Sequence, residues 1–139
     1  MDVETRLKEH QNKQFSKWDI DLSFGERNEE KLVKILKHGK IEVKTERDKW
    51  HKTGNIAIEL SCFGKKSGLA ITEADWWATI LSWKDEIKGI ILVPVKNMKK
   101  IVKNSVKNGR GVIIMGGDEN ASELVLMPME DLINGIQKK

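Results

Sequence analysis

The alternation of apolar and polar residues predicts two short strands early in the chain. In residues 41–45 every second position is apolar or threonine, and the positions between them hold Glu42 and Lys44. In residues 56–60 the apolar positions alternate in the same way, and Glu59 lies on the other side. We predict that these strands pair as an antiparallel hairpin, closed by a loop over residues 51–54, with Glu42 opposite Glu59. Because directly opposed like charges destabilise a strand pair, this register predicts a divalent cation between the two carboxylates.

The rest of the pattern predicts helices and strands in an order typical of α/β proteins. Gly39 ends the first predicted helix, and Asn108-Gly109 ends the third. Thr72 and Asp75 have the spacing of a helix cap, which predicts that the second helix begins there. The predicted elements are a helix over 25–36, strands over 41–45, 56–60 and 67–71, a helix over 72–83, a buried strand over 89–95, a helix over 96–107, strands over 111–115 and 124–127, and a helix from residue 129.

Glu29 lies on the apolar face of the first predicted helix. It comes three, four and seven residues before Leu32, Val33 and Leu36, so a helical repeat places its carboxylate on the side that packs against the sheet. A carboxylate directed inward needs a partner, which makes Glu29 a candidate site residue.

Length and composition predict one compact domain. A chain of 139 residues with 39% hydrophobic content can bury one core, and residues 1–17 are too polar to join it. We therefore expect a polar N-terminal arm over 1–17 and a single domain over 18–139. The net charge of +4 with 33% charged residues is compatible with nucleic-acid binding. Cys62 is the only cysteine and no segment is apolar enough to span a membrane, so we expect a cytoplasmic protein with no membrane partner.

Several of these segments together resemble the PD-(D/E)xK nuclease superfamily, in particular its small phage-type members and Holliday junction resolvases. The resemblance covers roughly residues 19–83 and depends on five segments: Phe24-Gly25-Glu26-Arg27-Asn28-Glu29, Ile41-Glu42-Val43-Lys44-Thr45, Thr53-Gly54-Asn55-Ile56-Ala57-Ile58-Glu59, Ser67-Gly68 and Thr72-Glu73-Ala74-Asp75-Trp76-Trp77. It implies a restriction-endonuclease-like αβββαβ core with a mixed sheet flanked by helices, here followed by a β-hairpin and a helix. It also implies cleavage of DNA phosphodiester bonds with Mg²⁺ or Mn²⁺.

The resemblance leaves two assignments of the catalytic motif open, because no Pro-Asp pair precedes Glu42 at the usual distance. In the first, Glu42-Val43-Lys44 is the ExK element and Glu29 replaces the first acid. In the second, which we prefer, Glu42 is the first acid, Glu59 is the second, and Lys44 takes the part of a lysine that is absent at Ser61.

Both assignments give the same candidate site. The predicted catalytic residues are Glu29, Glu42, Lys44 and Glu59, and the three glutamates are the predicted metal ligands. Between residues 84 and 110, eight Lys or Arg residues stand against two Asp or Glu residues, which is compatible with a surface that follows phosphates. The predicted DNA contacts are Lys65, Lys66, Ser67, Lys99 and Lys103.

Two other classes of function fit the same residues. The first alternative is a nucleic-acid-binding protein that has the nuclease fold but does not catalyse. The second is a structural or assembly protein whose strand carboxylates are simply solvated. Junction-cleaving nucleases generally need two sites, so the resemblance also leads us to expect a homodimer, in the host cytoplasm if a phage encodes the chain.

Overall fold

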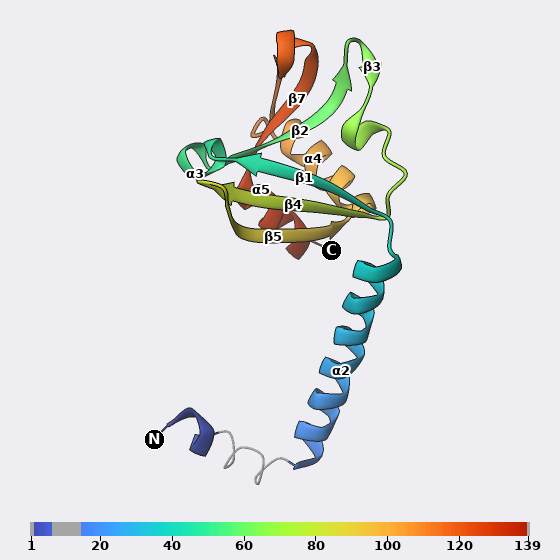
Figure 1. The fold of residues 1–139 in the computed structure, drawn as a ribbon, viewed down its shortest axis with the longest axis vertical. Helices are drawn as coiled ribbons and strands as arrows, with labels where there is room; N and C mark the ends of the chain where they lie inside the picture. The colour runs from blue at the N-terminus through green and yellow to red at the C-terminus, as the bar shows by residue number, and fades with distance from the viewer. Residues whose placement is uncertain (1, 7–14, 139) are drawn as a thin grey trace. The chain divides into compact units, whose positions relative to one another are not determined.

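The computed structural model describes residues 2–6 and 15–138 (Figure 1). The chain divides into two compact units, Met1–Gly39 and Lys40–Lys139. In the first unit, α2 spans Phe15–His38, and the Gly39 N–H donates to the Ile35 carbonyl at 2.8 Å at its end. The predicted helix over 25–36 and its stop at Gly39 are confirmed, but the predicted start at Gly25 is wrong, because the helix begins at Phe15. Residues 7–14 of the expected N-terminal arm lie outside the described residues.

The second unit contains two β-sheets and several helices, so the prediction of an α/β fold is confirmed. Its elements are β1 (Ile41–Arg47), α3 (Lys49–Thr53), β2 (Asn55–Cys62), β3 (Lys65–Lys66), the 3-10 helix η1 (Gly68–Ala70), β4 (Trp76–Trp83), β5 (Glu86–Pro94), α4 (Val95–Lys107), β6 (Val112–Gly116), the 3-10 helix η2 (Asp118–Asn120), β7 (Ser122–Pro128) and α5 (Met129–Gln137).

Sheet A is formed by β1, β4 and β5, in the order β1-β4-β5. β1 runs parallel to β4, with Glu42 in register with Trp77, while β4 and β5 form an antiparallel pair. In Figure 1 the three strands lie side by side. The predicted antiparallel pairing of the strand at 41–45 with the strand at 56–60 is therefore wrong, because β1 takes its partner from residues that follow β2.

Sheet B is antiparallel and has the order β3-β2-β7-β6. The Glu59 position of β2 is in register with Leu124 of β7, and not with Glu42 as predicted. The predicted strands at 111–115 and 124–127 are confirmed as β6 and β7, which pair as a hairpin. The strands that carry Glu42 and Glu59 thus belong to different sheets.

The core of the second unit combines side chains from both sheets, α4 and α5. α4 packs against β4, β5 and β7, and α5 packs against α4 and β7 (Figure 1). Each large apolar side chain that is fully buried contributes about 1.5–3 kcal/mol. Nine core residues are at most 2% exposed: Ile56, Ile58, Leu69, Trp77, Val93, Met98, Val125, Met127 and Leu132.

The predicted strand over 67–71 and the predicted helix over 72–83 are both wrong. Gly68–Ala70 forms η1, and Gly68 has a φ of 53°, which a regular strand does not contain. The Thr72 hydroxyl accepts a hydrogen bond from the Ala74 N–H at 3.2 Å, as it would in a cap, but the chain then extends into β4. Aromatic and β-branched residues in 76–83 favour this strand, and β1 and β5 pair with it on both sides.

Candidate functional site

β1 directs a row of charged side chains toward the interior of the second unit. Glu42, Lys44 and Glu46 alternate along the strand, and their register partners on β4 include Trp77 and Thr79, which are 2% and 3% exposed. Partners in a parallel ladder share a face of the sheet, so the charged row continues the buried face of sheet A. Val43, on the other face, is 53% exposed. The apolar side of this strand therefore faces outward, and its charged side is half-buried.

Glu42 and Lys44 form an ion pair on this face. Lys44 Nζ lies 3.2 Å from Glu42 Oε1. The Lys44 side chain is 41% exposed and the Glu42 side chain is 37% exposed. The ammonium group and the carboxylate, two predicted site residues, are thus brought together by the two-residue repeat of one strand.

Glu46 is a third member of the row, and the sequence analysis did not single it out. Its Oε1 accepts a hydrogen bond from the Ala57 N–H of β2 at 3.0 Å. Burial raises the pKa of the Glu46 carboxyl, and the weaker effect of the Ala57 N–H opposes that rise. The signal was present in the sequence, since Glu46 continues the alternation of Glu42 and Lys44.

Glu59 lies on sheet B, and its carboxylate accepts hydrogen bonds from two serine hydroxyls. Ser67 Oγ donates to Glu59 Oε2 at 3.0 Å, and Ser122 Oγ donates to Glu59 Oε1 at 2.8 Å. Ser122 is 6% exposed, so this carboxylate satisfies a hydroxyl that is almost removed from water. Glu59 thereby connects β2 to β7 and to the start of η1.

The other predicted site residues are distributed as follows. Glu29 is exposed on α2 in the first unit, and its convergence with the β1 residues stays a prediction. Lys65 and Lys66 form the exposed strand β3. Lys99 and Lys103 are exposed on α4, beside a mainly apolar groove of about 370 Å³ between that helix and sheet B.

Of the three predicted metal ligands, β1 carries one, Glu42. Mg²⁺ usually keeps several waters and binds through one or two carboxylates together with substrate phosphates. Glu42 is one carboxylate, and its Oε1 is paired with Lys44. Within residues 2–6 and 15–138, no three His, Cys, Asp or Glu side chains gather closely enough to form a metal site by themselves. The predicted roles of Glu29 and Glu59 as metal ligands stay predictions.

Comparisons of this chain with protein-family models, curated proteins and solved structures found no match. Among the helices of the described residues, none is long and apolar enough to cross a membrane.

Proposed function

We propose that this protein is a metal-dependent nuclease that hydrolyses phosphodiester bonds of DNA, with Glu42 and Lys44 at the centre of its site. The observation that carries the proposal is the 3.2 Å contact between Lys44 Nζ and Glu42 Oε1 on the inward-facing side of β1. An ion pair with this exposure contributes less than about 1 kcal/mol to stability. Its register partners Trp77 and Thr79 are buried, so the pair lies on the inward-facing side of sheet A, and this placement supports the proposal.

Each residue has a defined part in this proposal. A divalent ion held by the Glu42 carboxylate would lower the pKa of a bound water and neutralise phosphate charge. Lys44 directs its ammonium group toward the same place, where it binds a phosphate oxygen and stabilises the negative charge that develops during attack on phosphorus. Glu59 is proposed as a further carboxylate of the site, and the restriction-endonuclease-like core is proposed as its scaffold.

The lysines of α4 support nucleic acid as the substrate. Its buried face consists of apolar residues and Ser105, and its lysines lie on the exposed side. The helix contains no acidic residue that would neutralise them. Lysines contact phosphates without reading the base sequence, so this surface suits a DNA backbone. The exposed lysines of α4 are Lys96, Lys99, Lys100, Lys103 and Lys107.

The second candidate function is nucleic-acid binding without catalysis. The hydrogen bonds of Glu59 favour it, because both carboxylate oxygens already accept serine hydroxyls. In that case Glu59 is a structural residue, and the α4 lysines account for the whole activity.

A cleavage experiment separates the two candidates. Supercoiled plasmid and a four-way junction are incubated with the full chain in the presence and absence of Mn²⁺, and binding is measured in parallel by gel shift. The nuclease proposal predicts nicking that requires the metal and falls by about 100-fold or more in Lys44→Ala and Glu42→Gln. Binding without turnover at any metal concentration would favour the second candidate.

β5 provides a matched control for these variants. Lys88 Nζ lies 2.8 Å from Glu86 Oε2, with the same two-residue spacing, on the opposite edge strand of sheet A. The Glu86 side chain is 73% exposed, so this pair is a solvated one. Lys88→Ala and Glu86→Gln should leave cleavage unchanged, and an equal loss in both pairs of variants would contradict the proposed site.

A further inference from the structure

A cavity of about 610 Å³ lies between α4 and α5, and the proposed reaction at β1 does not use it, although Lys100 in its lining is also one of the α4 lysines proposed to contact DNA. One stripe of α4 and one stripe of α5 form its walls, since the lining residues recur at helical spacing on both. The polar side chains of these walls include Asn97, Lys100, Asn104, Asn108, Asn134 and Lys138.

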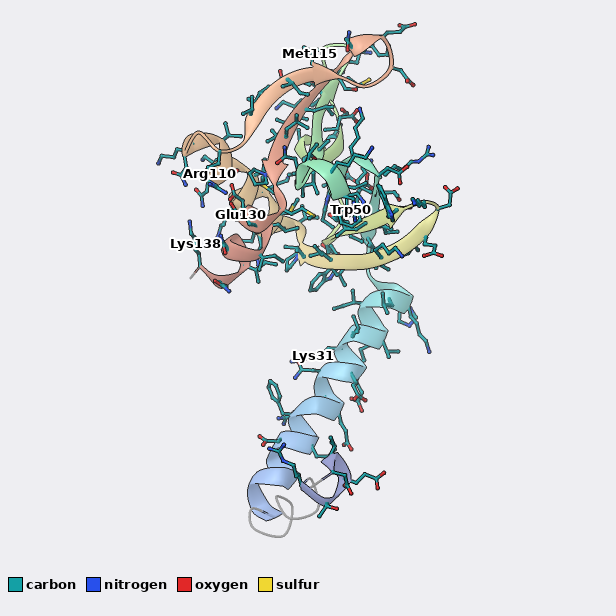
Figure 2. All side chains as sticks on the ribbon, turned by 90° about the vertical axis from the view of Figure 1, so that its left-hand side faces the viewer. Lys31, Trp50, Arg110, Met115, Glu130 and Lys138 are labelled. Atoms are coloured by element: carbon teal, nitrogen blue, oxygen red, sulfur yellow. The ribbon has the colours of Figure 1, made fainter. Side chains whose placement is uncertain are left out.

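One end of the cavity is a fixed hydrogen-bonded network. Ser105 is 3% exposed, and its Oγ donates to Asp131 Oδ2 at 2.6 Å. Arg110 Nε donates to Asp131 Oδ1 at 2.7 Å, and a second nitrogen of Arg110 pairs with Glu130. Figure 2 shows Arg110 and Glu130 near one another at this side of the unit, with Lys138 next to them. The guanidinium is thereby held in one orientation at the cavity wall.

The floor of the cavity is a close contact between the two helices. A Cβ atom added at Gly135 would lie 2.5 Å from Cγ1 of Ile101. This approach fixes the separation of α4 and α5, so the cavity walls are part of the packed unit.

The chemistry of the lining indicates which ligands fit. Arg110 is already paired with Asp131, the one carboxylate of the lining, and with Glu130 beside it, so Lys100 and Lys138 provide the remaining positive charges of the lining. That balance disfavours a metal cation and favours an anion such as phosphate. The four asparagine carboxamides each present a donor and an acceptor, which matches the edge of a nucleobase or the hydroxyls of a sugar.

We propose that the cavity between α4 and α5 binds a nucleoside monophosphate unit, with its phosphate at Lys100 and Lys138 and its base or sugar at the asparagines. The unit is either a free mononucleotide or the terminal nucleotide of a strand that carries a 5′-phosphate. The proposal does not depend on the proposed reaction at β1, because the two sites share no residue.

The test is a titration of the full chain, monitored by the side-chain NH₂ resonances of the asparagines and by calorimetry. The probes are deoxyadenosine 5′-monophosphate, deoxyadenosine, inorganic phosphate and a 5′-phosphorylated tetranucleotide. We expect saturable binding of the monophosphate with a Kd of about 1 mM or tighter, and weaker binding of deoxyadenosine and of phosphate alone. The asparagine resonances should shift together.

Lys99 gives a matched control for Lys100, because the two lysines are neighbours on α4 and only Lys100 lines this cavity. Lys100→Glu should weaken monophosphate binding by about tenfold, which corresponds to about 1.4 kcal/mol, and Lys99→Glu by less than about twofold. Asn104→Ala should also weaken the monophosphate while leaving phosphate unchanged.

The outcomes are distinct. Binding by both the monophosphate and the tetranucleotide, in competition, would identify a strand end as the ligand, whereas binding by the monophosphate alone would identify a free nucleotide. Absence of saturation up to about 10 mM, equal losses in Lys99→Glu and Lys100→Glu, or deoxyadenosine binding as tightly as its monophosphate would each overturn the proposal. Retained cavity binding in a chain without nuclease activity would contradict the proposed function at β1 alone.

Discussion

Glu46 Oε1 accepts a hydrogen bond from the Ala57 N–H at 3.0 Å, and this bond connects the edge strand of sheet A with β2 of sheet B. β3 pairs with β2 only at Ser61 and Cys62, so it does not reach Ala57. The carboxylate therefore serves a backbone donor that the sheet leaves unpaired. Removing it with Glu46→Leu should lower the free energy of unfolding by about 1–2 kcal/mol. Glu46→Gln keeps an acceptor oxygen and should cost less in the same urea titration; equal losses would contradict this role.

The same residue predicts a pH dependence of stability. Burial raises the pKa of Glu46 in the folded state above its ordinary value of 4.5. A carboxyl with a raised folded pKa makes the folded state bind more protons, so the free energy of unfolding falls as the pH rises from the ordinary value through the raised one. Unfolding measured at several pH values should show this decrease in the wild type and not in Glu46→Gln.

Glu59→Leu tests the structural part of the Glu59 site. It leaves the hydroxyls of Ser67 and Ser122 without their acceptor, and Ser122 is almost fully buried. We expect a loss of about 1–3 kcal/mol in the free energy of unfolding. In Ser122→Ala one of the two donors is already absent, so Glu59→Leu should cost less in that background. Additive losses would indicate that the hydrogen bond contributes nothing.

Gly135→Ala tests the contact between α4 and α5. The new Cβ would lie 2.5 Å from Ile101, and overpacking of this kind costs about 1–3 kcal/mol. Alanine gains up to about 1 kcal/mol of helix propensity, which offsets only part of that cost. The loss should shrink in an Ile101→Ala background, which a double-mutant cycle measures. Gly25→Ala is the control, since nothing lies within 4 Å of a Cβ at Gly25 in α2.

Asp131 predicts a pH dependence of stability opposite to that of Glu46. Burial tends to raise its pKa, but the hydrogen bonds from Ser105 and Arg110 outweigh burial and leave the pKa below its ordinary value of 3.8. The folded state therefore binds fewer protons, so the stabilisation is present above the ordinary value and is lost as the pH falls through the lowered one. Asp131→Asn should remove this acid-dependent loss and cost about 1–3 kcal/mol at neutral pH. Glu130→Gln, at a 66% exposed side chain, should cost less than about 1 kcal/mol.

Most elements of the second unit could be predicted from the sequence because their signals are local. The apolar run at 89–95 falls mostly in β5, the apolar stripe after Lys96 is α4, and the glycine-rich turn before residue 122 joins β6 to β7. The prediction that this run is a buried strand is wrong, because β5 is an edge strand of sheet A and Ile90 is 60% exposed. The segment 72–83 was predicted wrongly because Thr72 gives the same side-chain hydrogen bond in a turn as in a helix cap. The pairing of residues 76–83 with β1 and β5 is what makes this segment a strand.

The candidate site could be predicted only in part, because alternation shows which residues share a face and not which strand lies beside it. Glu42 and Lys44 meet because both belong to β1. The prediction that Glu42 faces Glu59 needed a β1–β2 hairpin, whereas the structure pairs β1 with β4 and β2 with β7. The inward direction of Glu46 follows from the same long-range pairing, which the local pattern does not contain.

The pairing of β2 with β7 also has a consequence during synthesis on the ribosome. Glu59 lies on β2 and Ser122 on β7, and these two hydrogen-bonded residues are 63 positions apart in the chain. Until the later strand emerges from the exit tunnel, β2 exposes Ile56 and Ile58 and has a free edge that other nascent chains can join. Translation that pauses between the two strands should therefore expose the polypeptide to aggregation and to chaperones for longer.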